Sequence, residues 1–422
     1  MRNFLKKEKV DMVNLIEFTV GNFLSFNEKK TLSMEAASIR ELPENTFVKG
    51  NCKLLKSAVV YGANSSGKSN LINALKFMKE TILNSSKLNS TDKFNVSPFL
   101  LNEEAVQSPS YFEILFYHFD VRYRYGFELD DDRVYAEWLY TLPARGTKKE
   151  QLLFARDLEG IAVSELFNGA SGLEERTRDN GLFLSVCDQF NVILAGSLIR
   201  AIDNIVIVSG VDHKDLDSMT RVYMTSETRL IKDFFRELQL GFTDIRTSGE
   251  DKWQDKALTT HNVYDGRGNI KGQHLFKILE SESAGTNKVY DLAGYLLYAL
   301  EFGLTIVIDE LDAKLHPLLT KKIIEMFHSE EVNPKDAQLI FATHDTNLLG
   351  CDCFRRDQIW FAEKNKKEET DLYSLVEFRN AEGTKVRNDR NYEKDYIEGR
   401  YGAIPFIGNF SNLMKDGKEK RD

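Results

Sequence analysis

The alternation of apolar and polar residues predicts strands in the first third of the chain and helices near its middle. Short β-rich runs separated by turns occupy residues 14–36, and the apolar run at 57–61, Ser-Ala-Val-Val-Tyr, is typical of a buried strand. Three alternating runs between residues 111 and 140, separated by turn residues, predict an antiparallel meander. From about 182 to 241 the apolar residues recur at helical spacing, and the last of these helices ends at a glycine.

The C-terminal part of the chain combines exposed segments with two strongly apolar strands. Residues 246–272 are charged and loop-like, so we expect an exposed connection there. Buried strands are predicted at 304–308 and 337–341. The tail beyond Phe378 is rich in charged residues and asparagine, and its composition predicts a mobile stretch at 381–395. We find no internal repeat, no low-complexity tract and no long heptad run.

Composition and charge narrow the possible classes of protein. The chain has 422 residues and a net charge of −9, which argues against a broadly basic nucleic-acid-binding surface but leaves room for a local patch. Its four cysteines form no C-x-x-C pair and no zinc-type cluster, so neither a disulfide nor a zinc site is expected, and a reducing cytoplasm fits. The most apolar stretch, 293–308, is interrupted by Glu301 and is too short to span a membrane. Residues 1–11 show no secretory signal and are expected to form a loose extension.

A glycine-bounded loop follows the strand at 57–61 and precedes apolar residues at helical spacing. Its sequence, Gly62-Ala-Asn-Ser-Ser-Gly-Lys-Ser69, is a complete G-x-x-x-x-G-K-[ST] motif. The glycines let the backbone curl until successive N–H groups point inward, and the helix that begins near Lys68 adds its positive end. Lys68 is predicted to reach the β- and γ-phosphates of a nucleotide, and the Ser69 hydroxyl to bind Mg²⁺. The predicted nucleotide-binding residues of this segment are Gly62, Asn64, Ser65, Ser66, Gly67, Lys68, Ser69 and Asn70.

The apolar strand at 304–308 leads into two acids, Asp309 and Glu310. Asp309 is predicted to hold Mg²⁺ through its water shell, and Glu310 to polarise the attacking water. An apolar strand that ends in acids is common, but this one shares its chain with a phosphate loop. Residues 70–308 are far more than one crossover requires, so the meander and helices must be inserted between two halves of one core. This separation resembles that of ABC-type ATPases of the SMC and RecF kind.

Three further segments agree with this resemblance, which implies their roles. Ser283 and Gly285 lie where the superfamily has its signature loop, although Ser-Ala-Gly-Thr is also the sequence of an ordinary helix N-cap. His344 follows the second apolar strand and is similar to the switch histidine that contacts the γ-phosphate. Asp312 resembles a D-loop residue, whereas His316, which opens the next helix, is interpreted as structural.

The predicted fold class is α/β, an ABC-type P-loop ATPase core with an inserted antiparallel β meander and a helical lobe. We expect the N-terminal half of the core at 1–110, the meander and helical lobe at 111–275, and the C-terminal half at 276–422. The expected catalytic residues are Lys68, Glu310 and His344, and the expected Mg²⁺ ligands are Ser69 and Asp309.

The whole chain resembles a prokaryotic group of AAA-labelled, ABC-type ATPases related to RecF and OLD proteins, including the RloA-like and abortive-infection ATPases. The stretches that carry the resemblance are "IEFTVGNFLSF", "VVYGANSSGKSNLINAL", "PFLL", "FEILFYHFDVRYRYGFEL", "LQLGFTDI", "SAGTNKV", "TIVIDELDAKLHPLL", "FATHDTNLL" and "YGAIPFIG". The resemblance implies a cytoplasmic ATPase that uses ATP and Mg²⁺ and forms a head-to-tail dimer or higher homo-oligomer. It also implies a separate nuclease or toxin as partner in anti-phage defence.

Two other functions compete with a defence role. The main alternative is a DNA-repair or DNA-clamp ATPase, in which Arg122, Arg124, Lys148 and Lys149 could contact DNA, although solvated surface charge explains these residues more simply. The other is a scaffold that binds ATP and barely hydrolyses it.

Particular residues argue against two further classes of protein and leave one motif open. A GTPase would need Asn-Lys-x-Asp, which residues 287–290 lack, and no toprim or HNH nuclease pattern follows His344. The superfamily's Q-loop glutamine has no clear match. Gln107 lies near the expected place, which residues 97–99 occupy.

Overall fold

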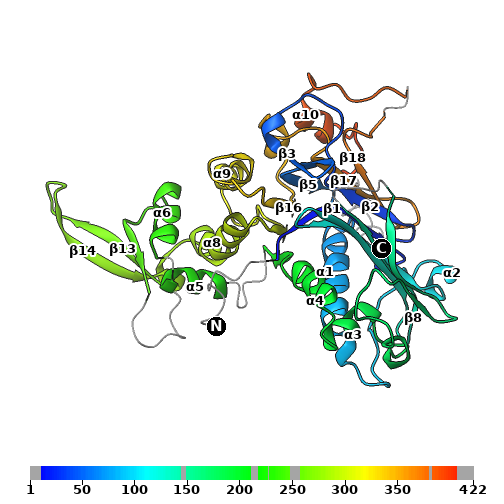
Figure 1. Cartoon of the computed structure of the whole chain (residues 1–422). Helices are drawn as coiled ribbons and strands as arrows, with labels where there is room; N and C mark the ends of the chain where they lie inside the picture. Colours follow the sequence, from blue (N-terminus) through cyan, green and yellow to red (C-terminus); the bar gives the residue numbers. More distant parts are fainter. Residues whose placement is uncertain are drawn as a thin grey trace, which may run out of the picture.

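A six-stranded sheet lies at the centre of the molecule, with its strands in the order β11-β15-β16-β5-β17-β18 (Figure 1). The computed structural model describes residues 11–143, 149–210, 217–226, 228–247, 257–379 and 383–405. The strands of this sheet are β5 (Ser57–Tyr61), β11 (Val206–Ser209), β15 (Thr305–Asp309), β16 (Gln338–Ala342), β17 (Ile359–Lys364) and β18 (Thr370–Ser374). Its pairs are parallel except β17 with β18, which is antiparallel.

Both faces of the central sheet are covered, which explains why its strands read as continuous apolar runs. Successive side chains of β5 point to opposite faces, so Ala58 and Val60 join one hydrophobic core while Val59 and Tyr61 join another. Helix α1 (Lys68–Asn84) lies in the first core, and α8 (Ala284–Phe302) and α9 (Pro317–His328) lie in the second. The sheet is therefore held rigidly between two helical layers.

A seven-stranded antiparallel sheet packs on the other side of α1, in the order β10-β9-β8-β7-β6-β1-β2 (Figure 1). Its strands are β1 (Val13–Gly21), β2 (Lys30–Ser33), β6 (Ser110–His118), β7 (Val121–Leu129), β8 (Val134–Leu142), β9 (Gln151–Arg156) and β10 (Ile161–Val163). The predicted meander is thus present as β6, β7 and β8. Because β1 pairs directly with β6, the expected boundary at residue 110 runs through this sheet, and the division into three parts stays a proposal.

Shorter elements complete the fold, and the predicted α/β fold class is confirmed. The remaining elements are η1 (Pro43–Asn45), β3 (Thr46–Lys49), β4 (Cys52–Leu55), η2 (Ser85–Lys87), α2 (Glu103–Val106), η3 (Glu174–Arg176), α3 (Phe183–Gln189), α4 (Ile193–Asp203), α5 (Ser218–Ser226), α6 (Thr228–Leu238), α7 (Ile278–Ser281), η4 (Thr346–Gly350) and α10 (Tyr392–Ile397). Helix α6 ends at Leu238, before the predicted Gly241, because Gln239 already adopts a left-handed conformation with φ of 49°.

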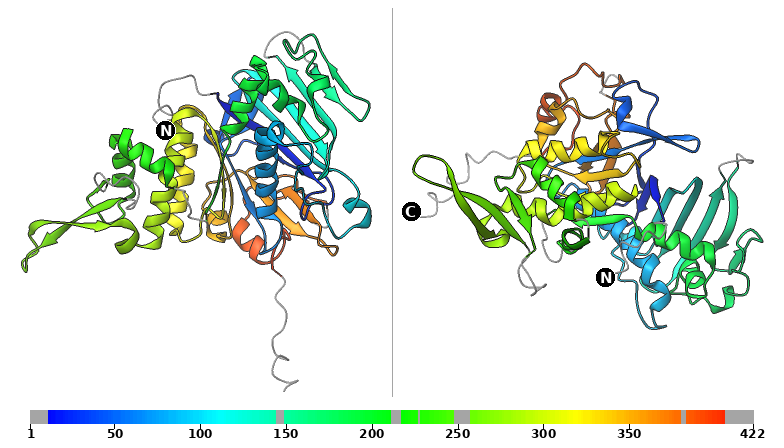
Figure 2. Two further views of the ribbon diagram at one scale, coloured as in Figure 1. Left: turned by 90° about the horizontal axis from the view of Figure 1, so that it is seen from below. Right: turned by 60° about the vertical axis from the view of Figure 1, so that its left-hand side comes forward.

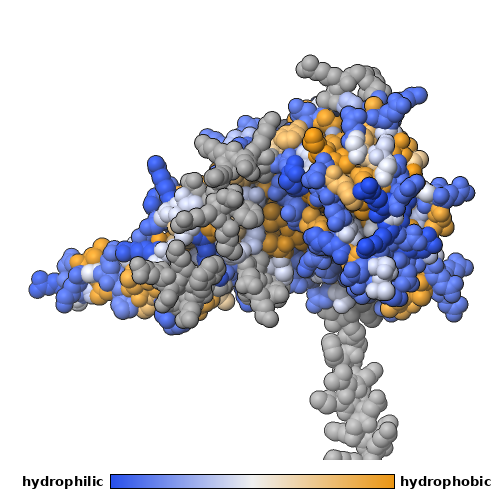
Figure 3. All heavy atoms as spheres, turned by 60° about the horizontal axis from the view of Figure 1, so that its bottom comes forward, coloured by the Kyte–Doolittle hydropathy of each residue, from blue (hydrophilic) through white to orange (hydrophobic). Residues whose placement is uncertain are grey.

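A hairpin projects from the body where the sequence predicts only an exposed connection, so that prediction is wrong in part (Figure 2). Strands β13 (Leu258–Tyr264) and β14 (Ile270–Lys277) pair with each other and with β12 (Asp244–Arg246). Every residue of β14 is exposed, so no buried face imposes the alternating pattern by which a strand is recognised. In Figure 3 this extension carries hydrophobic and hydrophilic residues side by side. Tyr264 and Ile270 of its two strands are both exposed.

Three further expectations concern the cysteines, the tail and membrane segments. The structure joins Cys351 to Cys353 by a disulfide, contrary to expectation, because the turn after η4 brings the two side chains together. Helix α10 begins within the stretch 381–395 that is predicted to be mobile, so four of these residues are helical. Residues 381–382 of that stretch lie outside the described residues, as do residues 1–10. Within the described ranges no single helix is long and apolar enough to cross a membrane, while the pair α3 and α4, bent by 112°, passes by length and composition together.

Candidate nucleotide-binding site

The predicted site segments meet at one edge of the central sheet. Strand β16 lies between β15 and β5, and all three run parallel, so their carboxyl ends are neighbours. The phosphate loop follows β5, Asp309 ends β15, and His344 follows β16 by two residues. Ligands of open α/β sheets bind at this edge. The strand order thus gathers segments that are far apart in the sequence.

The phosphate loop owes its shape to close backbone approaches. Gly67 immediately precedes α1 and has a φ of 110°, a backbone conformation that residues other than glycine rarely adopt. A Cβ added to Gly67 would collide with the Thr370 hydroxyl, and one added to Gly62 would collide with the Ala362 carbonyl. The loop therefore opens directly onto the N-terminus of α1, where backbone N–H groups favour an anion.

Lys68, the first residue of α1, is folded back over the loop. Its Nζ donates hydrogen bonds to the carbonyl oxygens of Gly62 (2.8 Å) and Ala63 (3.0 Å), and its side chain is buried. Burial lowers the pKa of Lys68 to about 8, against the opposing attraction of Asp309 and the two acids that follow it. The structure thus brings the lysine of the loop and the acids after β15 into one electrostatic environment.

Several buried oxygen atoms at this edge have no hydrogen-bond partner in the described part of the chain. They are Tyr61 OH, Ser66 Oγ, Asp309 Oδ1 and Asp312 Oδ1. Buried polar atoms are normally paired, so this cluster is the kind of place where an ion and a polar ligand belong. Carboxylate and hydroxyl oxygens are also the donors that Mg²⁺ prefers, so the residues present fit the predicted metal.

Protein side chains alone would not complete a metal shell here. Among the described residues no group of three or more His, Cys, Asp or Glu side chains could hold an ion. Mg²⁺ usually takes one or two carboxylates and completes its shell with phosphate oxygens and water. Ser69, half-buried at the start of α1, and Asp309 would be the protein's contribution.

Glu310 adopts an uncommon backbone conformation immediately after β15. Its φ is 52°, in the left-handed region that residues with a side chain rarely enter. Its carbonyl oxygen accepts hydrogen bonds from Ala313 N (3.2 Å) and from Lys288 Nζ (2.8 Å), and Gly210 N donates to the Asp309 carbonyl (2.6 Å). The turn that carries Glu310 is therefore held from two sides.

His344 interacts electrostatically with the same lysine and acids, although it is exposed to solvent. Partial desolvation and the nearby Lys68 charge lower the pKa of His344, while Asp312, Glu310 and Asp309 oppose the shift. The imidazole is therefore neutral at neutral pH and free to donate or accept a hydrogen bond.

The Ser283 segment serves as a helix cap within one chain. Ser283 Oγ accepts a hydrogen bond from Thr286 N (3.1 Å) at the start of α8 and lies 3.0 Å from Thr286 Oγ1, and its side chain is exposed. Its hydrogen-bond partners are thus within α8 rather than in the phosphate loop. Gly285 faces the segment after β15, because an added Cβ would lie 2.8 Å from the Lys314 carbonyl oxygen. His316 caps α9, its Nδ1 accepting from Leu318 N (3.2 Å), as the structural interpretation predicts.

Two residues that support the phosphate loop were not predicted. Thr370 Oγ1 lies 2.9 Å from the Ser66 carbonyl oxygen and 2.7 Å from Ser25 Oγ, and Asn70 Nδ2 donates to the same Ser25 oxygen (2.7 Å). A consistent proton arrangement has Thr370 donating to Ser66 and Ser25 donating to Thr370. Ser25 lies in the quoted stretch "NFLSF", whereas no sequence signal marks Thr370, which joins the site only through the pairing of β17 and β18.

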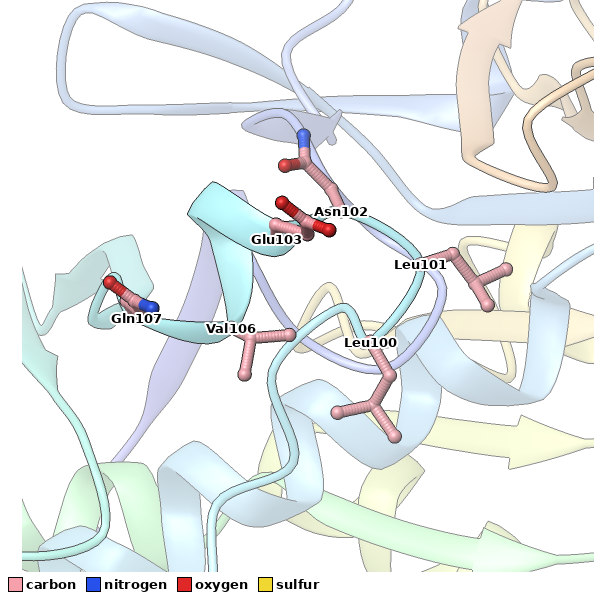
Figure 4. A pocket seen from close by; sticks show the side chains of 6 residues that line it. All are labelled: Leu100, Leu101, Asn102, Glu103, Val106 and Gln107. Atoms are coloured by element: carbon pink, nitrogen blue, oxygen red, sulfur yellow. The ribbon is translucent and has the colours of Figure 1, made fainter.

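The Q-loop glutamine remains a prediction. Gln107 lies exposed at the end of α2, and Figure 4 shows it with the other residues that line a surface pocket of about 420 Å³, which are Leu100, Leu101, Asn102, Glu103 and Val106. Residues 97–99 are hydrogen-bonded to the turn that contains Ser25, because the Ser97 carbonyl accepts from Leu24 N (2.8 Å). This segment therefore adjoins the support of the phosphate loop.

Comparisons with known proteins add three findings. Residues 57–350 match the model of a family described as "AAA domain, putative AbiEii toxin, Type IV TA system". A solved structure described as "Structure of the recombination mediator protein RecF-ATP in RecFOR pathway" is similar over 87% of this chain and 99% of that chain, with 12% sequence identity and a TM-score of 0.34. No match is found among curated proteins. The family match covers the phosphate loop, Ser283, Asp309 and His344.

Proposed function

We propose, because this chain belongs to the family of AAA domains whose model it matches, that it binds ATP with Mg²⁺, hydrolyses it, and uses that cycle to regulate a separate effector protein. The observation that carries the proposal is the meeting of Lys68 with the acids after β15. The buried Lys68 donates to two loop carbonyls and is attracted by the charge of Asp309, and one carboxylate oxygen of Asp309 lacks a partner among the described residues. A phosphate group and a divalent cation between them would satisfy both.

Each residue has a role in this proposal that follows from its position. Lys68 exchanges the carbonyls of Gly62 and Ala63 for the β- and γ-phosphate oxygens, whose negative charge favours its protonated form. Ser69 and Asp309 hold Mg²⁺, which when bound neutralises phosphate charge and orients the γ-phosphate. Glu310 accepts a proton from the attacking water, and His344 contacts the γ-phosphate.

The exposed position of Ser283 supports a head-to-tail dimer as part of the proposal. Its side chain is exposed at the N-terminus of α8, where it can approach the γ-phosphate bound by a second copy. In that arrangement each site takes Lys68 and Glu310 from one subunit and Ser283 from the other, with Asp312 near the subunit boundary. ATP binding then closes the dimer, and hydrolysis opens it.

The test of nucleotide binding compares two lysines of the same helix. Lys68→Ala should abolish tight Mg-ATP binding measured by calorimetry, whereas Lys76→Ala should leave it unchanged, because Lys76 is exposed on α1 and pairs only with Glu80 among the residues described. Equal affinities for wild type and Lys68→Ala would contradict the proposal.

The family description supports anti-phage defence as the biological role, with a nuclease or toxin as the regulated effector. The matching test expresses the chain with its neighbouring gene and challenges the cells with phage. Protection that needs both genes and is lost with Lys68→Ala is the expected result. Protection without the neighbouring gene would contradict a separate effector.

One observation favours DNA maintenance as a second candidate function. The hairpin at 258–277 carries three basic residues and one acidic residue in a chain of net charge −9, and its aromatic Tyr264 is exposed. The arginines considered from the sequence are weaker candidates, because Arg122 and Arg124 pair with Glu150 at 3.3 and 2.8 Å, and Lys148 lies outside the described residues. DNA-stimulated ATP hydrolysis that falls steeply with salt would favour this function over defence.

A further inference from the structure

Lys288 occupies an unusual position in α8. Its side chain is buried, with only 1% of its surface exposed, and its Nζ donates hydrogen bonds to the carbonyl oxygens of Glu310 (2.8 Å) and Ala313 (2.7 Å). Both carbonyls belong to the turn that follows β15. One ammonium group therefore joins helix α8 to the segment that carries the proposed catalytic base.

Packing alone does not explain a lysine at this position. Burial of an ammonium group is costly, and a methionine of similar length would fill the space without that cost. The lysine instead provides two charge-assisted hydrogen bonds, which hold the Glu310 and Ala313 carbonyl groups in one orientation. Glu310 has a φ of 52°, and a peptide in that conformation needs its surroundings to hold it.

A second contact joins the same helix to the same turn. Gly285, in the first turn of α8, comes so close to the segment after β15 that an added Cβ would lie 2.8 Å from the Lys314 carbonyl oxygen. Ser283 caps this helix at its N-terminus. The first two turns of α8 thus contact the segment 310–314 at two points, and a displacement of Ser283 along the helix axis would reach Glu310.

We propose that Lys288 is a positioning residue that couples the Ser283 end of α8 to the orientation of Glu310. The inference rests on the proposed ATPase function and deepens it. When Ser283 meets a nucleotide bound by a second copy, α8 is fixed, and Lys288 transmits that constraint to the Glu310 peptide. Hydrolysis in one site then depends on correct engagement of the neighbouring site, while ATP binding by Lys68 does not.

The experiment uses the full chain and separates positioning from stability. Lys288→Met should lower kcat at least about tenfold and change the KM for ATP by less than about twofold, because the nucleotide contacts are untouched. Lys288→Arg, which keeps a cation and N–H donors, should recover part of kcat. The control is Lys56→Met, because Lys56 is equally buried and donates to the His328 carbonyl (3.3 Å), remote from Glu310. It should lower Tm and leave kcat unchanged.

Each outcome decides one of the two proposals. Lys288→Met with wild-type kcat, or with kcat lowered no more than in Lys56→Met at equal loss of Tm, would overturn the coupling role. A rise in KM that accounts for the whole loss of kcat/KM would also overturn it. If Lys288→Met does not fold, Lys288→Gln, which retains an N–H donor, provides the same comparison. Wild-type hydrolysis that Lys68→Ala leaves intact would instead contradict the proposed ATPase site.

Discussion

Replacing Gly67 by alanine tests the geometry of the phosphate loop with the fewest assumptions. Gly67 has a φ of 110°, so alanine there pays a backbone strain of about 1–3 kcal/mol. Its Cβ would also collide with the Thr370 hydroxyl and lie 2.7 Å from Thr370 Cγ2. Thr370 is buried and has to move, which breaks its contacts with the Ser66 carbonyl and with Ser25.

The cost of the displaced threonine can be separated from the backbone strain. Leaving a buried hydroxyl and its partner unsatisfied costs about 1–3 kcal/mol. Gly172 is a matched control, because it has a φ of 85° and an added Cβ would meet nothing within 4 Å. Gly172→Ala should therefore show the backbone strain alone. Gly67→Ala should lower the free energy of unfolding by about 1–3 kcal/mol more than Gly172→Ala.

The measurement is urea denaturation of the two variants and of Thr370→Ala, alone and combined with Gly67→Ala. Removing the Thr370 hydroxyl and methyl group removes most of the collision, so the double variant should be less destabilised than the sum of the two single variants. Gly67→Ala should also weaken Mg-ATP binding, because the loop cannot keep its N–H groups pointing inward. Equal destabilisation by Gly67→Ala and Gly172→Ala, with additive double-variant energies, would refute the close approach of the loop to β18.

Four other predictions concern catalysis, subunit assembly and the protonation of Lys68. Glu310→Gln should retain Mg-ATP binding but slow hydrolysis by about 10²-fold or more, and it should trap an ATP-bound dimer visible by gel filtration; wild-type turnover would remove Glu310 from its role. Lys68→Ala and Ser283→Arg subunits, each inactive alone, should regain ATPase activity on mixing, and mixed dimers without activity would exclude a composite site. Burial lowers the pKa of Lys68 from 10.5 to about 8. Between about pH 8 and pH 10.5 the unfolded chain therefore binds more protons than the folded one, so the free energy of unfolding of the nucleotide-free protein should rise with pH across this range. Bound phosphate favours the protonated lysine, so ATP affinity should fall above about pH 8; an unchanged affinity up to pH 10 would contradict the contact.

Local sequence patterns predict the parts of the site whose geometry is set by neighbouring residues. The loop from Gly62 to Ser69 is built by two glycines and the first turn of the helix that follows, so its motif contains most of its own geometry. The strand that ends at Asp309 is also recognised from local sequence, because burial on both faces makes it continuously apolar. The projecting hairpin has no such pattern, because every residue of its outer strand is exposed.

Local sequence patterns do not predict contacts between segments that are distant in the chain. Thr370 supports the loop from a strand about 300 residues away, and its place depends on β17 pairing with β5 and then with β18. In the sequence Lys288 looks like an ordinary polar residue of a helix, and only the structure shows its Nζ bonded to the Glu310 and Ala313 carbonyls. A pattern in a single sequence does not predict which backbone oxygen accepts a hydrogen bond from a buried lysine.

The order of the strands therefore decides what the motifs can do together. The motifs at Lys68, Asp309 and His344 each indicate a chemical role, but only the strand order β15-β16-β5 makes their loops neighbours at one edge of the sheet. The same order places β17 beside β5 and so brings Thr370 beneath Gly67. It also leaves α8 on the far face of the sheet, where Lys288 can hold the turn after β15 from behind without blocking the nucleotide. Under the proposed coupling, an effector that moves α8 would therefore change hydrolysis through Lys288 and leave the Lys68 contacts in place.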